Sequence, residues 1–186
     1  MKSWLLILLM LGMSGCSFNG KRAAVALHDL GPTVVDHEVG ASYSTAITVS
    51  APEWLTGTHL HYRQLFSSPT VLKAYSRDRW IAPPEELLER RFGLIKRKQG
   101  LVLNIELVEF EQQFEAPDLA RSLFSFNAEV FRRGSREPLK QHFFSFQQEN
   151  ETANAAGAIK SFAELSDRAA GELETWLDIL NVSVDE

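Results

Sequence analysis

Hydrophobic and polar residues alternate along three long stretches in the second half of the chain, at residues 101–114, 119–133 and 138–149. A period of two residues is typical of a β-strand that buries one face. The alternation is clean in residues 119–133, whereas in residues 101–114 it is interrupted near Val108. Residues 133–136, which read Arg-Gly-Ser-Arg, supply a hairpin turn. The pattern predicts a meander of three long strands.

The first half of the chain contains shorter β-type segments. Residues 23–30 form a brief apolar run that a Gly-Pro pair closes, and residues 45–50 form a β-rich run that an Ala-Pro pair closes. Residues 58–66 alternate, and residues 71–75 offer a short strand that would pair with them. We therefore expect up to four short strands before the meander.

Two segments have helical rather than strand character. Two prolines followed by two glutamates at residues 83–86 favour a helix start, and a basic stretch followed by Gly100 favours its end. In residues 152–180 the apolar positions recur every three or four residues. The members of that stripe are Ile159, Phe162, Leu165, Ala169, Leu173, Trp176, Leu177 and Leu180. The order of elements predicts the α/β class: a single domain over residues 23–186, with a mixed β-sheet and packed helices that include a long C-terminal one.

Composition narrows the classes of protein to which the chain can belong. Its 186 residues are 45% hydrophobic and carry a formal net charge of −5, which suits one folded domain and excludes general disorder. The negative charge argues against nucleic acid as a partner. A single cysteine makes neither an internal disulfide bond nor a cysteine-rich metal site.

The N-terminus has the pattern of a targeting segment rather than of the folded domain. Lys2 precedes an apolar run at residues 4–11, and small residues follow, so residues 1–15 are predicted to be a signal peptide. Cys16 comes directly after Met-Ser-Gly, an arrangement that resembles a bacterial lipobox with methionine in place of the usual leucine. The alternative is a plain secretory peptide with a chance cysteine.

The lipobox reading makes Cys16 the lipid attachment site, carrying fatty acyl chains such as palmitate, and residues 16–22 a lipidated tether. Several acyl chains give stable membrane attachment, because each buried CH₂ group contributes about 0.8 kcal/mol. Ser17 and Phe18 follow the cysteine instead of the aspartate that retains lipoproteins at the inner membrane. The expected location is therefore the outer membrane, facing the periplasm.

No combination of residues points firmly to catalysis. His59 and His61 share a strand face, but nothing selects a third metal ligand. Glu109 and Glu111 also share a face, as paired carboxylates of glycosidases do, although an edge strand commonly carries such charges. The sequence contains no nucleophile elbow, dinucleotide-binding loop or P-loop. We therefore expect a protein that is not an enzyme and that holds no metal or cofactor.

Basic and aromatic residues instead suggest contact surfaces. Arginines and lysines concentrate at residues 77–98 and again at residues 132–136, where they either meet anionic partners or are simply solvated. Phe143 and Phe144 are adjacent and must point to opposite faces of a strand. Trp54 and Trp80 lie beside prolines in segments predicted to be loops, and tryptophan is common at interfaces. These two tryptophans are the candidate partner-binding residues, with plugging of the core edge as the alternative.

The mature chain resembles the ABC-type transport auxiliary lipoproteins, the family that includes paraquat-inducible lipoprotein C. The residues that carry the resemblance occur in order between about residues 25 and 180. They are His28 to Pro32, where the family often has Tyr-x-Leu, Pro52 to Leu55, Tyr62-Arg63, Tyr75 with Trp80 and Pro83, Leu87-Leu88, Leu107 with Phe110 to Gln112 and Phe114, and Leu173 with Trp176-Leu177.

The resemblance implies a fold akin to the N-terminal domain of TolB and to anticodon-binding domains. It also implies a non-catalytic role beside an ABC transporter and a membrane protein of the mammalian-cell-entry (MCE) type, in a system that moves lipids or other hydrophobic molecules between the two envelope membranes. A second copy of the chain is a further expected partner. The alternatives are an envelope hydrolase or sugar-binding lipoprotein, and a purely structural envelope lipoprotein.

Overall fold

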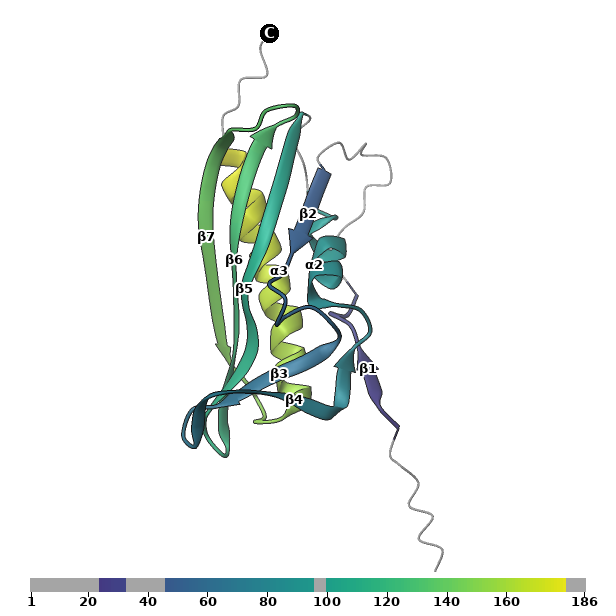
Figure 1. The fold of residues 1–186 in the computed structure, drawn as a ribbon, viewed down its shortest axis with the longest axis vertical. Helices are drawn as coiled ribbons and strands as arrows, with labels where there is room; N and C mark the ends of the chain where they lie inside the picture. The colour runs from purple at the N-terminus through teal and green to yellow at the C-terminus, as the bar shows by residue number, and fades with distance from the viewer. Residues whose placement is uncertain (1–23, 33–45, 96–99, 180–186) are drawn as a thin grey trace, which may run out of the picture.

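The computed structural model describes residues 24–32, 46–95 and 100–179 (Figure 1). The strands of the first half are short, except for the last of them: β1 (Ala26–His28), β2 (Ala46–Ser50), β3 (His59–Gln64) and β4 (Ser68–Trp80). Helix α2 (Pro84–Phe92) follows, then the long strands β5 (Leu101–Ala116), β6 (Leu119–Arg132) and β7 (Pro138–Glu149), and finally helix α3 (Ala155–Ile179). This order confirms the predicted sequence of elements.

The strands form one mixed sheet of seven strands in the order β1-β4-β3-β5-β6-β7. Strand β5 is long enough to pair with two strands on one edge: its first part is parallel to β2 and its last part is parallel to β3. The β5-β6-β7 meander is antiparallel throughout, as the alternation predicts. Strand β1 adds to the far edge, where it runs parallel to β4.

The helices pack on one face of this sheet. Helix α3 contacts β6 and β7, helix α2 contacts β2, and the two helices touch each other. Figure 1 shows α3 running along the length of the meander. Most of the predicted stripe of α3 is buried: Phe162, Leu165, Ala169 and Leu173 are fully covered and Ile159 is partly covered, while Leu180 lies outside the described residues. A layer of helices on a sheet therefore encloses a single core, as expected for an amphipathic helix on a half-buried sheet.

A β-bulge explains the interrupted pattern of β5. Leu107 pairs with Phe126 and Glu109 pairs with Ser125, so Val108 is an extra residue in the ladder. Before the bulge the odd-numbered apolar residues face the helices, and after it Phe110 and Phe114 do. The bulge keeps the apolar side chains on one face of the sheet, although the buried positions change from odd-numbered to even-numbered residues.

Two predicted boundaries are wrong. Strand β4 runs from Ser68 to Trp80, much longer than the predicted segment at residues 71–75. Helix α2 ends at Phe92 with Gly93 as its C-cap, whereas the prediction extended it towards Gly100. The predicted basic last turn falls at residues 96–98, which lie outside the described residues.

Candidate functional site

The predicted lipid attachment site, Cys16, lies outside the described residues, as do the whole of the predicted signal peptide and tether. The described chain begins at Ala24, two residues before the start of strand β1. Within the described part of the chain, neither helix is both long enough and apolar enough to cross a membrane. The described structure therefore leaves the acylation of Cys16 as a prediction.

Trp54 lies in a tight turn after strand β2. The backbone amide of Leu55 donates a hydrogen bond of 2.8 Å to the carbonyl oxygen of Pro52, and the hydroxyl of Thr56 donates one of 2.7 Å to the carbonyl oxygen of Glu53. The turn buries Leu55 completely and leaves Trp54 45% exposed. Trp54 therefore remains a candidate contact residue, displayed by a turn that Leu55 fixes to the core.

The prediction that Trp80 binds a partner is wrong. Trp80 is the last residue of β4 rather than part of a loop, and only 1% of its surface is exposed. Its ring lies 5.7 Å from the ring of Phe110 on β5 and 5.8 Å from that of Phe162 on α3. The backbone amide of Trp80 also donates to the carbonyl oxygen of Thr58. Trp80 is a core residue, so the alternative reading of a core plug is correct.

The paired glutamates of β5 have structural partners. Arg63 donates two hydrogen bonds to the carboxylate of Glu111, from Nε to Oε1 at 3.0 Å and from Nη2 to Oε2 at 3.1 Å. The amide of Gln113 donates to the same carboxylate at 2.8 Å, and the hydroxyl of Ser125 donates to Glu109 at 3.0 Å. The hydrogen bond with Glu111 raises the pKa of Arg63. The two hydrogen bonds between Arg63 and Glu111 join the parallel strands β3 and β5.

The two histidines of β3 stack on each other, with ring centroids 5.8 Å apart. Burial, and secondly the neighbouring His59, lower the pKa of His61, so its imidazole is held neutral. The described residues contain no group of three or more His, Cys, Asp or Glu side chains placed to hold a metal ion. The spacing that suggested two metal ligands therefore produces a stacked pair without a third ligand beside it in this part of the chain.

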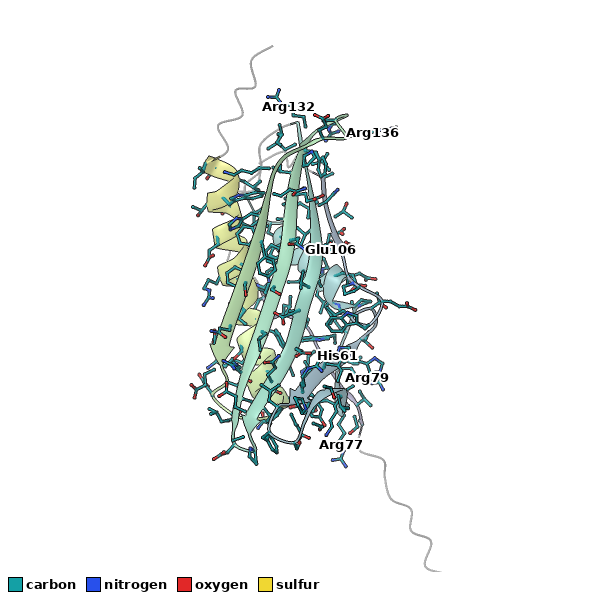
Figure 2. The ribbon with its side chains drawn as sticks, turned by 60° about the vertical axis from the view of Figure 1, so that its left-hand side comes forward. His61, Arg77, Arg79, Glu106, Arg132 and Arg136 are labelled. Carbon is teal, nitrogen blue, oxygen red and sulfur yellow. The ribbon has the colours of Figure 1, made fainter. Side chains whose placement is uncertain are left out.

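One arginine of the predicted basic surface is buried. Arg91 on α2 is 4% exposed, and its Nη1 forms an ion pair of 2.6 Å with Asp167 on α3. Its Nη2 donates to the carbonyl oxygens of Leu30 and Gly31. Arg91 therefore connects the segment after β1 to both helices. Arg132 and Arg136 lie at one end of the molecule, whereas Arg77 and Arg79 lie near the other (Figure 2).

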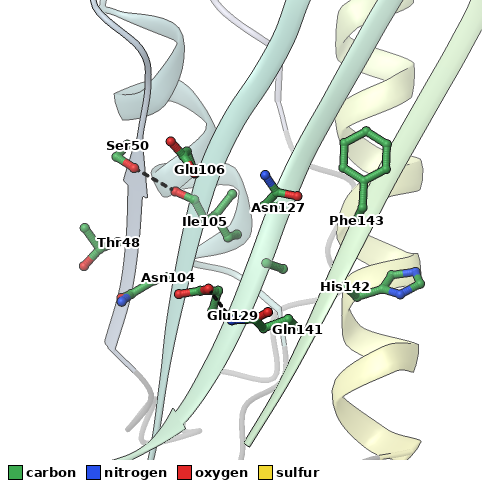
Figure 3. A pocket seen from close by; sticks show the side chains of 11 residues that line it. Thr48, Ser50, Asn104, Ile105, Glu106, Asn127, Glu129, Gln141, His142 and Phe143 are labelled. Carbon is green, nitrogen blue, oxygen red and sulfur yellow. Dashed lines mark hydrogen bonds between the residues drawn. The ribbon is translucent and has the colours of Figure 1, made fainter. Parts of the chain in front are cut away.

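A hollow in the described surface lies on the sheet face opposite the helices. It has a volume of about 740 Å³ and is lined by residues of β2, β5, β6 and β7. Two rows of side chains cross it: Thr48, Asn104, Glu129 and Gln141 form one, and Ser50, Glu106, Asn127 and Phe143 form the other. Figure 3 shows both rows. Strand register creates this polar surface, and the local sequence pattern does not predict it.

Within the hollow, the side-chain amide of Gln141 donates a hydrogen bond of 2.6 Å to the carboxylate of Glu129 (Figure 3). The hydroxyl of Ser50 donates one of 3.3 Å to the carbonyl oxygen of Ile105. Phe143 is 52% exposed. Its neighbour Phe144 is buried under α3, with the centre of its ring 5.8 Å from the centre of the Trp176 ring. The two phenylalanines point to opposite faces, as predicted. The hollow therefore combines one exposed aromatic ring with amide and carboxylate groups.

No family model matches the sequence, and no curated protein matches it. Among solved structures, a Xanthomonas campestris protein of the DUF330 family superposes with a TM-score of 0.69 and 17% identity, over 83% of this chain and 95% of its own. A second structure, described as an uncharacterized protein, superposes with a TM-score of 0.63 and 12% identity, over 83% of this chain and 99% of its own. At these identities the comparison concerns the fold, and it confirms a single mixed α/β domain with a long C-terminal helix.

Proposed function

We propose that this protein is a non-catalytic accessory lipoprotein of an MCE-type ABC transport system that moves lipids or other hydrophobic molecules between envelope membranes. Acylated Cys16 anchors it to the outer membrane, and the domain faces the periplasm. The proposal is supported by the lipobox-like sequence before the lone cysteine and by the ordered motifs that resemble the auxiliary lipoprotein family. The MCE-type protein is the proposed docking partner.

The geometry that best supports docking is the hollow on the open sheet face. Interfaces that assemble and separate typically combine an aromatic centre with a polar, partly hydrated rim. Phe143, at the end of one row on the edge strand β7, supplies the exposed aromatic ring, and the amide and carboxylate groups beside it supply the polar, hydrated part. Most side chains that line the hollow are polar, so it suits a protein surface better than an acyl chain. This favours an accessory role over that of a lipid carrier.

The first experiment tests the anchor. Cys16→Ala removes the only thiol of the chain, so acylation is lost and the variant leaves the outer-membrane fraction. Intact mass measures the acyl chains, and fractionation measures the location. A Cys16→Ala variant that still fractionates with the outer membrane contradicts the anchor.

The second experiment tests the docking face. The native lipoprotein and a Phe143→Ala variant are purified from membranes, and the proteins that accompany them are identified by mass spectrometry. Phe66→Ala is the matched control, because Phe66 is 47% exposed but lies in the β3–β4 turn. We expect MCE and ABC components with the native chain and the control, and at least a tenfold loss with Phe143→Ala. Equal recovery from all three refutes docking through the hollow.

Trp54→Ala belongs in the same comparison, since Trp54 is the remaining predicted contact residue and lies outside the hollow. Loss of association without loss of stability assigns it to an interface. A sugar-binding lipoprotein is the second candidate, because an exposed aromatic ring beside amides and carboxylates also suits a sugar. Saturable binding of soluble oligosaccharides that Phe143→Ala abolishes, without co-purified transport proteins, would favour that function instead.

A further inference from the structure

Three exposed apolar side chains gather around the edge where β1 pairs with β4. Val25 directly precedes β1, Leu27 lies on β1, and Ile81 directly follows β4. Leu27 is 61% exposed and Ile81 is 58% exposed, values that exceed those of most large apolar residues in the described chain. Such a cluster at a sheet edge is a typical mark of a contact surface.

Two arginines share this edge. Leu27 pairs with Arg79 in the β1–β4 ladder, so both side chains lie on the same face, and Arg77 and Ile81 are two residues to either side of Arg79. Asp78 lies between the arginines in sequence, but it points to the other face and pairs with His28 at 3.0 Å. In the described chain neither Arg77 nor Arg79 forms an ion pair. We name Val25, Leu27, Arg77, Arg79 and Ile81 the β1-edge patch.

The position of the β1-edge patch relates it to the predicted anchor. Seven residues lie between Cys16 and Ala24, where the described chain begins, and the eight Cα-to-Cα steps from one to the other span at most about 29 Å. An acylated Cys16 therefore keeps Ala24, at the start of this edge, within about 29 Å of the membrane surface. Arg132 and Arg136 mark the opposite end of the molecule, at the β6–β7 turn (Figure 2).

We propose that the β1-edge patch docks on the anionic phospholipid surface to which Cys16 attaches the chain, an inference that rests on the proposed acylation. Val25, Leu27 and Ile81 enter the interfacial layer, and the guanidinium groups of Arg77 and Arg79 meet lipid phosphates. A cationic side chain near an anionic surface strengthens binding by about fivefold. Docking fixes the orientation of the domain, with the β6–β7 turn pointing away from the membrane.

The test uses the acylated full-length chain in vesicles of phosphatidylethanolamine and phosphatidylglycerol. Because Cys16 is the only cysteine and its sulfur is blocked by acylation, a second cysteine is the only free thiol. Leu27→Cys and, as the matched control at the far end, Arg136→Cys each receive an environment-sensitive fluorophore. Lipids with a quencher near the headgroup report contact with the membrane. Intact mass and vesicle flotation verify acylation and attachment separately.

We expect the label at residue 27 to be quenched at least threefold more than the label at residue 136. Arg77→Glu combined with Arg79→Glu, or neutral phosphatidylcholine vesicles, should remove most of that difference while flotation persists. Equal quenching of the two labels on chains that float overturns the docking but leaves the anchor intact. A blue shift at residue 27 that rises with protein concentration in detergent without lipid assigns the edge to self-contact and also overturns the proposal. Loss of acylation or flotation refutes the anchor itself.

Discussion

Replacing each of two tryptophans with alanine should give very different losses of stability. Trp80 is 1% exposed and contacts Phe110 and Phe162, so its ring joins the sheet to α3. Truncation of a buried tryptophan removes apolar burial and leaves a cavity, which together cost about 3–5 kcal/mol. Trp54 is 45% exposed, and substitutions at exposed sites usually change stability by about 0.5 kcal/mol or less.

Urea unfolding followed by far-ultraviolet circular dichroism measures both free energies of unfolding, because that signal is dominated by backbone secondary structure, unlike the tryptophan fluorescence that each substitution changes. For a domain of this size, about 1 kcal/mol corresponds to roughly 2–4 °C in the melting temperature. Trp80→Ala should therefore melt about 6–20 °C lower, and Trp54→Ala within about 2 °C of the native chain. Trp80→Phe, which keeps an aromatic ring in the core, should lose less than Trp80→Ala. A loss below about 1 kcal/mol for Trp80→Ala, or equal losses for the two alanine variants, would refute the assignment of Trp80 to the core.

Three further perturbations test other parts of the structure by the same unfolding measurement. Gly157→Ala places a Cβ atom 2.0 Å from the backbone oxygen of Thr152 and should destabilise the chain. Gly171→Ala, on the same helix, places its Cβ atom more than 4 Å from any other group and should stabilise the chain by up to about 1 kcal/mol. A gain in stability from both substitutions would refute the close approach at α3. Asn150→Ala should cost about 2–4 kcal/mol, because its amide links buried hydrogen bonds of β5, β6 and α3; a loss under about 1 kcal/mol would contradict that role. Burial holds the pKa of His61 below 6.5, so as the pH drops below about 6.5 the unfolded chain takes up a proton before the folded chain does, and the free energy of unfolding falls. His61→Gln should reduce this dependence of stability on pH. An unchanged dependence would exclude His61 as its source.

The alternation in the second half of the chain predicts the β5-β6-β7 meander, because these strands bury one face under the layer of helices. The dependence of the prediction on alternation also explains why the predicted strand at residues 71–75 is shorter than β4. The stretch from Ser76 to Arg79 is polar on both faces, since it lies near the sheet edge, and therefore gave no strand signal. The sequence therefore predicts a loop at Trp80. Its burial depends on Phe110 and Phe162, which are distant in sequence.

The hollow could not be predicted because it depends on strand order and register. Thr48 and Ser50 lie beside Asn104 and Glu106 only because β2 pairs in parallel with the first part of β5. A single sequence contains no local signal for such a pairing between distant segments. A row of polar residues at alternate positions indicates a solvent-facing strand side, but not which strands lie next to it.

The attachment of β1 has a mechanical consequence. For a chain held through Cys16, a pull on the domain reaches the described structure first at β1. Where the pull runs parallel to the strand, the β1–β4 ladder is loaded in shear, so its hydrogen bonds resist together rather than one at a time. Shortly after β1, the carbonyl oxygen of Leu30 accepts a hydrogen bond from Arg91 on α2, and Arg91 forms an ion pair with Asp167 on α3. A force that exceeds the strength of the β1–β4 ladder therefore acts next on both helices. Under load, the three-residue strand should detach before the long meander yields, which would lengthen the lead to the membrane while the core stays folded.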